Sequence, residues 1–165
     1  MKEPILVIPC SGIGKVHGLL SREAAYLVVD ELAADQADVV CLALLVKGDE
    51  ETLARVRRRP TLTLDGCGKA CAQKNVELAG GQVAKAFQVG RFLAGHRGSQ
   101  PGTGSELTEE GWLVARELAS EAAAEVRRLV GPAATHASAA HAPAAAGPAA
   151  SPGPAEGSLS KAGVP

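Results

Sequence analysis

The stretch ILVIPCSGIG, residues 5–14, decides the fold class of this chain. Its first half, residues 5–8, is a short and continuous apolar run, which is typical of a strand buried on both faces of a sheet. Its second half is rich in glycine and predicts a turn. Residues 15–32 then carry a broad apolar stripe that predicts a helix, so the chain opens as a β-α unit.

The same alternation of strand and helix patterns continues along the chain. Further strands are predicted over residues 39–45, 61–64 and 82–89, and further helices over residues 50–58 and 69–78 and from Thr108 to near Arg128. The side chains of Asp49 and Thr108 suit the N-cap positions of the helices that follow them. This order of elements predicts an α/β fold, with a small four-stranded, mostly parallel sheet and helices on both of its faces.

The composition of the chain changes sharply after residue 130. Residues 1–130 form one predicted domain, whereas residues 131–165 consist largely of Ala, Pro, Gly and Ser, with Leu159 and Val164 as the only larger aliphatic residues. Such a segment buries too little apolar area to offset the cost of ordering it, so we predict a disordered C-terminal tail. His136 and His141 are interpreted as solvated residues of this tail.

The overall charge and apolar patterning exclude several classes of partner. The formal net charge of −1 favours neither nucleic acid nor an anionic membrane, and the scarcity of aromatic residues argues against base stacking. The longest apolar run, residues 39–46, is much shorter than the roughly 20 residues of a membrane helix. No secretory signal is visible, so we expect a cytoplasmic protein. In that reducing compartment, cysteines are more often metal ligands or reactive thiols than disulfides.

Four cysteines are placed where the predicted strands end. Cys10 lies two residues after the first strand, Cys67 lies three residues after the third, and Cys41 lies in or near the end of the second. Cys71 lies one helical turn beyond Cys67, on the same face of the predicted helix. The carboxyl ends of parallel strands meet at one sheet edge, and the strand order 2-1-3-4 makes the first three strands neighbours. The sequence therefore predicts a four-cysteine zinc site at this edge.

Three stretches of this sequence resemble the DGC-domain family, which is named for a central Asp-Gly-Cys motif. They are DGCGKAC at residues 65–71 with the following Lys74 and Asn75, IPCSGIGK at residues 8–15, and VCLA at residues 40–43. The Gly111-Trp112 pair is also similar, and the resemblance spans about residues 5–130. It implies zinc binding through four chelating cysteines, which correspond here to Cys10, Cys41, Cys67 and Cys71. It implies no biochemical role.

Other interpretations of the cysteines stay open. The chain fits a thiol-based redox or sulfur-transfer enzyme in which Cys10, activated by its glycine turn and Lys15, is the nucleophile and Cys67 or Cys71 resolves it. Cys41 alone also fits a buried hydrophobic residue. A third interpretation is a partner-binding or metal-delivery module that uses the tail as a tether. Thiolates suit iron and copper as well as zinc, and the sequence identifies no protein partner.

Several residues near the cysteines have competing interpretations. Asp65 is expected to cap the helix or turn that follows it rather than to act as a base. Val16 follows Lys15 where a nucleotide-binding phosphate loop needs Ser or Thr, which argues against that function. His17 is interpreted as a surface helix residue, with the alternative that it is a hydrogen-bonding partner of the cysteine site. His96 lies in a basic, glycine-rich loop that is either a lid over the site or a solvated segment.

Overall fold

The computed structural model of the protein describes residues 3–131. The predicted tail therefore lies outside the described residues except for Gly131, and its disorder, with the roles of His136 and His141, stays a prediction. The boundary between residues 130 and 131 stays a prediction as well. No helix within residues 3–131 is long and apolar enough to cross a membrane.

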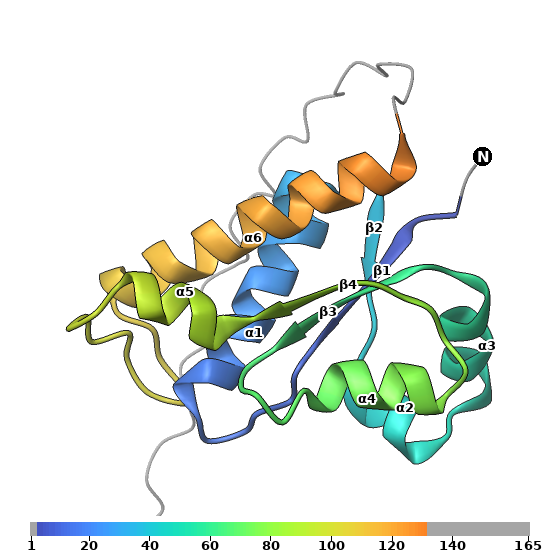
Figure 1. Ribbon diagram of the computed structural model, residues 1–165, viewed down its shortest axis with the longest axis horizontal. Helices are drawn as coiled ribbons and strands as arrows, with labels where there is room; N and C mark the ends of the chain where they lie inside the picture. Colours follow the sequence, from blue (N-terminus) through green and yellow to red (C-terminus); the bar gives the residue numbers. More distant parts are fainter. Residues whose placement is uncertain (1–2, 132–165) are drawn as a thin grey trace, which may run out of the picture. The chain divides into compact units, whose positions relative to one another are not determined.

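Four parallel strands form one sheet in the order β2-β1-β3-β4 (Figure 1). The strands are β1 (Ile5–Pro9), β2 (Ala37–Val39), β3 (Thr61–Asp65) and β4 (Val83–Gln88). Every residue of the two central strands, β1 and β3, is buried. The predicted α/β fold and strand order are confirmed, and the apolar run that opens the chain is a central strand, as its composition requires.

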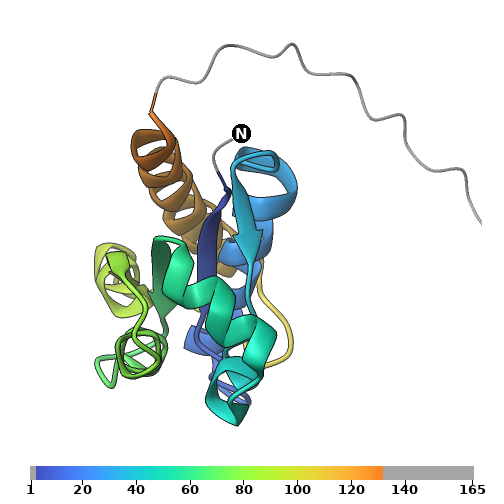
Figure 2. The same cartoon turned by 90° about the vertical axis from the view of Figure 1, so that its right-hand side faces the viewer.

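Helices cover both faces of the sheet (Figures 1 and 2). On one face lie α1 (Val16–Tyr26), the π-helix η1 (Leu27–Leu32), α5 (Val89–Gly95) and α6 (Glu109–Val130). On the other face lie α2 (Leu42–Lys47), α3 (Glu50–Arg58) and α4 (Cys71–Leu78). The side chains of β1 alternate between the two layers, because successive residues of a strand point to opposite faces. Ile5 and Val7 join the core under α1 and α6, whereas Leu6 and Ile8 join the core under α2 and α4.

Two predicted helix caps are confirmed. The Asp49 carboxylate accepts a hydrogen bond from the Thr52 N–H at 2.9 Å and begins α3. The Thr108 hydroxyl accepts a hydrogen bond from the Gly111 N–H at 3.2 Å and begins α6. Each cap satisfies a backbone donor that has no partner within its helix.

The second predicted strand, residues 39–45, is wrong beyond its first residue. β2 ends at Val39, and the same apolar run turns into α2. Within α2, Leu42 and Leu45 are buried one turn apart, while Leu44 and Val46 are exposed. A short, continuous apolar run does not by itself distinguish a buried strand from a buried helix, which is the physical reason for the error.

Smaller differences concern the ends of other elements. The predicted helix over residues 15–32 is divided into α1 and η1, and the helix predicted from residue 69 begins at Cys71. The short helix α5 was not predicted, and Val89 begins it instead of ending the fourth strand. Gly90 and Gly95 weaken the helical pattern of this segment in the sequence.

Candidate functional site

Cys10 is held firmly at the carboxyl end of β1. Its backbone N–H donates to the carbonyl oxygen of Leu64 at 2.9 Å and to the hydroxyl of Ser21 at 3.0 Å. Ser21 lies on α1, and its hydroxyl in turn donates to the Leu64 carbonyl. These bonds tie Cys10 to β3 and α1 together. The residue is 8% exposed, so its thiol is largely covered.

The glycine turn after Cys10 brings the start of α1 close to the thiol. Gly12 has a φ of +28°, and a Cβ built on it would lie 2.5 Å from the Gly18 Cα. The same Cβ position lies 3.7 Å from the Cys10 sulfur. Only glycine fits at this approach, because any side chain at residue 12 would collide with the backbone of α1.

Asp65 begins the Asp-Gly-Cys turn and is the cap of α4. Its carboxylate is 1% exposed and accepts hydrogen bonds from the N–H groups of Ala72, at 2.7 Å, and Gln73, at 3.2 Å. Burial raises the pKa of Asp65 above its ordinary value, although the N–H donors of Ala72 and Gln73 act in the opposite direction. The expectation that Asp65 caps the helix that follows it is confirmed.

The backbone between Cys67 and Cys71 is strained at one residue. Ala70 has φ +51° and ψ +50°, and it is the only residue other than glycine with a positive φ within residues 3–131. Its N–H donates to the Cys67 carbonyl oxygen at 3.1 Å, which closes the turn. Cys67 is therefore outside the helix, and the prediction that it shares a helix face with Cys71 is wrong. A strained residue between two cysteines marks this turn as a candidate functional segment.

Cys41 lies at the N-cap of α2, two residues after the end of β2. The N–H of Val40 donates to the Val7 carbonyl oxygen at 3.0 Å, so the backbone remains beside β1 up to this point. The Cys41 carbonyl oxygen then accepts the Leu44 N–H at 3.1 Å as the helix begins. Cys41 is exposed, which excludes its interpretation as a buried hydrophobic residue.

The segments that carry the four cysteines meet at the carboxyl edge of the sheet. Helices α2 and α4 pack against each other, and Cys41 and Cys71 lie at their N-terminal ends. A Cβ built on Gly66 would lie 3.2 Å from the His17 carbonyl group, so the turn before Cys67 contacts the start of α1.

The four sulfur atoms themselves do not surround a common point. Cys10 is buried, Cys41, Cys67 and Cys71 are exposed, and all four are free thiols. Among residues 3–131, no group of three or more His, Cys, Asp or Glu side chains is arranged to hold a metal ion. The type and number of donors suit zinc, but the cysteine side chains would have to move to bind it.

Two other residues of interest have clear places in the fold. His96 is held against α6, because its Nε2 pairs with the Glu117 carboxylate at 2.7 Å. His17 is half-buried in the first turn of α1, where its backbone borders the Asp-Gly-Cys turn. Sequence reasoning did not single out Ser21 or the strained Ala70, since neither belongs to a pattern that indicates its conformation or partners.

Comparison with known proteins adds one finding to this geometry. A family model described as the DGC domain matches residues 6–110, which is more than half of the chain. The matched segment includes all four cysteines and the Asp-Gly-Cys turn. Comparisons with curated proteins and with solved structures found no match. The chain belongs to the DGC domain family.

Proposed function

We propose that this protein binds one zinc ion through Cys10, Cys41, Cys67 and Cys71. The observation that carries the proposal is that Cys10, Cys41 and Cys67 follow the ends of three neighbouring strands, while Cys71 begins the helix next to them. Four thiolates are the donor set of a closed, tetrahedral zinc site. Such a site leaves no open coordination position, so the ion supplies stability rather than chemistry.

The surroundings of the cysteines favour negative charge at the edge. Cys71 opens α4, and Cys41 caps α2, so a thiolate at either position meets the positive end of a helix dipole. Lys15 and Lys69 are exposed. In the sequence, Lys15 adjoins the glycine turn after Cys10, and Lys69 adjoins the Asp-Gly-Cys turn. These positive groups partly offset the net negative charge of four thiolates around a divalent cation.

The four cysteines have different parts in the proposed binding. The backbone N–H of Cys10 is fixed by hydrogen bonds to the Leu64 carbonyl oxygen and the Ser21 hydroxyl, so Cys10 gives the ion an anchored first ligand. Cys41, Cys67 and Cys71 are exposed, so rotation of their side chains and closure of the turn at Ala70 bring them to the metal. Zinc binding is then coupled to ordering of the edge, as in other sites whose ligands gather only around the ion.

Elemental analysis of the full chain, purified without added zinc, tests the proposal. We expect about one zinc ion per chain, and a loss of most of it in each Cys→Ser variant. The double variant His136→Ala, His141→Ala is the matched control, since it removes the tail histidines and should leave the zinc content unchanged. Less than about half an equivalent of zinc, with no effect of the Cys→Ser changes, would contradict the proposal.

Thiol alkylation separates this proposal from a thiol-based redox or sulfur-transfer enzyme. Zinc-bound thiolates should be protected until a chelator is added. In the metal-free protein, the exposed Cys41, Cys67 and Cys71 should then react faster than the buried Cys10. Rapid modification of Cys10 at neutral pH without a chelator would favour the enzyme, with Cys67 or Cys71 as the resolving thiol.

A further inference from the structure

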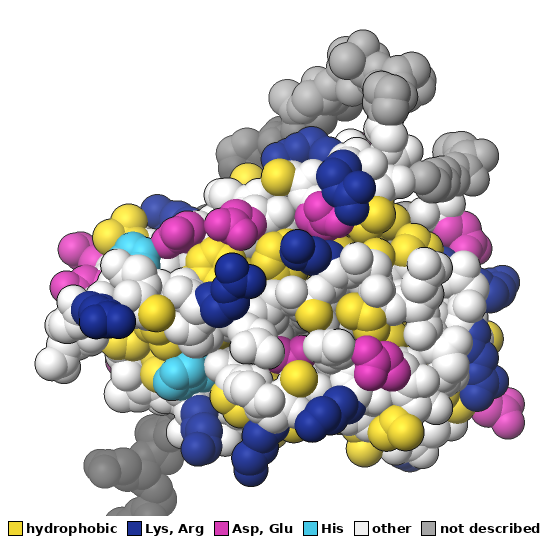
Figure 3. Space-filling view, in the orientation of Figure 1, with side chains coloured by type: hydrophobic (Ala, Val, Ile, Leu, Met, Phe, Trp, Pro, Cys, Tyr) yellow, Lys and Arg dark blue, Asp and Glu magenta, His cyan; other side chains and the backbone are white. Residues whose placement is uncertain are grey.

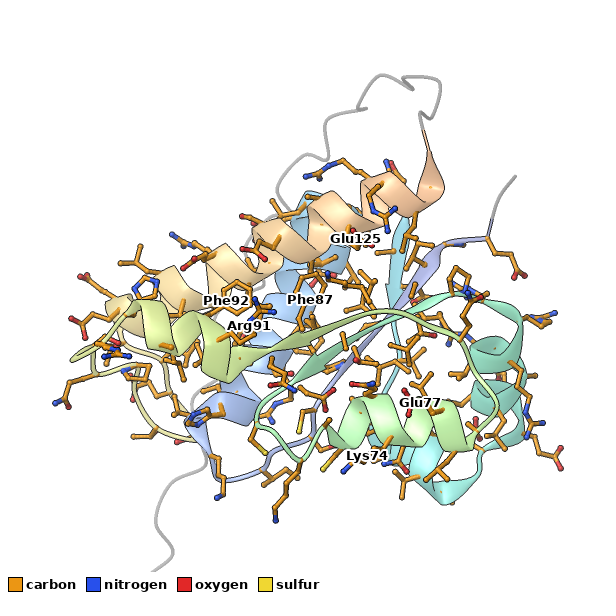
Figure 4. All side chains as sticks on the ribbon, in the orientation of Figure 1. Lys74, Glu77, Phe87, Arg91, Phe92 and Glu125 are labelled. Carbon is orange, nitrogen blue, oxygen red and sulfur yellow. The ribbon has the colours of Figure 1, made fainter. Side chains whose placement is uncertain are left out.

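A cavity of about 270 Å³ lies beside the edge strand β4, between α5 and α6. The two phenylalanines of the chain, Phe87 and Phe92, both line it. Figure 4 shows Phe87 from β4 and Phe92 and Arg91 from α5 grouped below α6. The side chains of Lys85, Glu117 and Glu121 also line the cavity. Its lining thus combines aromatic rings with charges of both signs.

One of the four charges at the cavity has an ion-pair partner, and a second lies near an aromatic ring. Glu117 is paired with His96 at 2.7 Å. Lys85 lies with its Nζ 6.0 Å from the centre of the Phe87 ring, on the side of the sheet that faces Glu125. A hydrogen bond from Arg128 and, more weakly, the charge of Lys85 lower the pKa of Glu125. Lys85 forms no hydrogen bond or ion pair within residues 3–131, and Arg91 and Glu121 lack even a ring contact. The ring contact keeps Lys85 over Phe87, so we take Arg91 and Glu121 as the two charges that meet a ligand.

Arg91 and Glu121 carry opposite charges and line the same cavity, yet they do not pair with each other. Both residues are exposed, and within residues 3–131 neither side chain forms a hydrogen bond or an ion pair. Hydrophobic surface lies between acidic and basic side chains on this face of the molecule (Figure 3). The arrangement is complementary to a small molecule that has one positive group, one negative group and an apolar part.

We propose that this cavity binds a free α-amino acid with an apolar side chain. Its carboxylate pairs with Arg91, its ammonium group pairs with Glu121, and its side chain packs on Phe92 beside the largely buried Phe87. Arg91 suits the carboxylate because a guanidinium donates two parallel hydrogen bonds. The cavity is slightly smaller than the roughly 300–1,000 Å³ of sites for drug-sized ligands, which fits a ligand of this size. No cysteine lines the cavity, so the proposed ligand would bind without contact to the cysteine thiols.

Binding of L-phenylalanine to the full, isotope-labelled chain tests this proposal by nuclear magnetic resonance. We expect the backbone amide signals of β4 and α5 to shift in a saturable manner. Two matched ligands each lack one charge: N-acetyl-L-phenylalanine has no ammonium group, and L-phenylalanine methyl ester has no carboxylate. Each should bind at least about tenfold more weakly than L-phenylalanine, because a hydrogen bond to a charged group is lost.

Two variants assign each charge to its partner. Arg91→Gln should weaken the binding of L-phenylalanine about tenfold and leave the binding of the methyl ester unaffected, since the ester has no carboxylate that could pair with Arg91. Glu121→Gln should weaken L-phenylalanine similarly and leave the N-acetyl compound unaffected. Arg97→Gln and Glu106→Gln, at exposed loop positions, are the matched controls and should change nothing.

Three outcomes would overturn the proposal. One is the absence of shifts in β4 and α5 at about 10 mM L-phenylalanine, a concentration that saturates even a site with a millimolar Kd. Another is equal binding of the three ligands. The third is weakening of all three ligands to the same extent by either variant, which would indicate a general effect on the fold rather than recognition of a zwitterion.

Discussion

Substitution of Gly12 by alanine tests how the glycine turn covers Cys10. Gly12 has a φ of +28°, and its new Cβ would lie 2.5 Å from the Cα and 3.2 Å from the N of Gly18. The left-handed conformation costs a residue with a Cβ about 1–2 kcal/mol. The collision with the backbone of α1 adds about 1–3 kcal/mol, the usual cost of overpacking. We therefore expect Gly12→Ala to lower the free energy of unfolding by about 2–5 kcal/mol.

Gly14→Ala is the matched control for this prediction. Gly14 also has a positive φ, of +79°, but no atom lies within 4 Å of the Cβ that the substitution would add. Only the conformational cost of about 1–2 kcal/mol remains. Denaturant unfolding of both variants, in the presence of a chelator that removes the contribution of any metal, measures the difference.

The reactivity of Cys10 gives a second readout for the same pair. The collision in Gly12→Ala pushes the start of α1 away from β1, so alkylation of Cys10 should become faster, whereas Gly14→Ala should leave its rate unchanged. Equal loss of stability in the two variants, with Cys10 equally protected, would refute the argument that this turn holds α1 against the thiol.

Three further substitutions have outcomes that follow from single contacts. Because burial raises the pKa of Asp65, the folded state binds its proton more tightly than the unfolded state does. Its contribution to stability is therefore present below the ordinary pKa of 3.8 and is lost as the pH rises through the raised value. The free energy of unfolding of Asp65→Asn, measured against pH, should lack this loss, because asparagine has no proton to release. Ala70→Gly should raise the free energy of unfolding by up to about 1 kcal/mol, as measured in denaturant, because glycine adopts a φ of +51° without strain. A decrease in stability would show that the Ala70 methyl group contributes more through packing than its backbone costs. Thr108→Ala should lower the melting temperature, because its hydroxyl accepts from the Gly111 N–H as an N-cap worth about 1 kcal/mol and also donates to the Gln100 carbonyl oxygen at 2.6 Å. Thr108→Ser keeps the hydroxyl and should restore the melting temperature; failure of serine to do so would exclude the two hydroxyl contacts as the cause.

The parts of the fold that were predictable depend on local physical rules. The central strand β1 is recognisable because its apolar run is short and ends at a glycine-rich turn. The caps at Asp49 and Thr108 are recognisable because a side-chain oxygen precedes an acidic first turn. The strand order 2-1-3-4 was chosen as one that makes the first three strands neighbours, and the topology agrees.

The parts that were not predictable depend on tertiary contacts. Residues 39–46 are apolar throughout, and only packing of Leu42 and Leu45 against α4 and the sheet decides that the run becomes helical after Val39. The left-handed backbone of Ala70 has no sequence signature. It follows from where α4 begins, and the hydrogen bonds from Ala72 and Gln73 to the buried Asp65 fix that position.

The same limit applies to the candidate site. The sequence predicts correctly that the cysteine-bearing segments reach one edge of the sheet, since that follows from strand ends alone. The directions of the sulfur atoms depend on the turns, and the prediction of a shared helix face for Cys67 and Cys71 failed at Ala70. Zinc binding itself stays a prediction, which rests on the four thiol donors and on where their segments lie.

X-ray absorption at the zinc edge of the full chain tests the central proposal most directly. Four sulfur neighbours at about 2.3 Å from the ion, with one sulfur lost in each Cys→Ser variant that still binds zinc, are the predicted result. A shell of nitrogen or oxygen atoms at about 2.0–2.2 Å, or a sulfur number that does not change when Cys10 or Cys41 is replaced, would contradict a site built from all four cysteines.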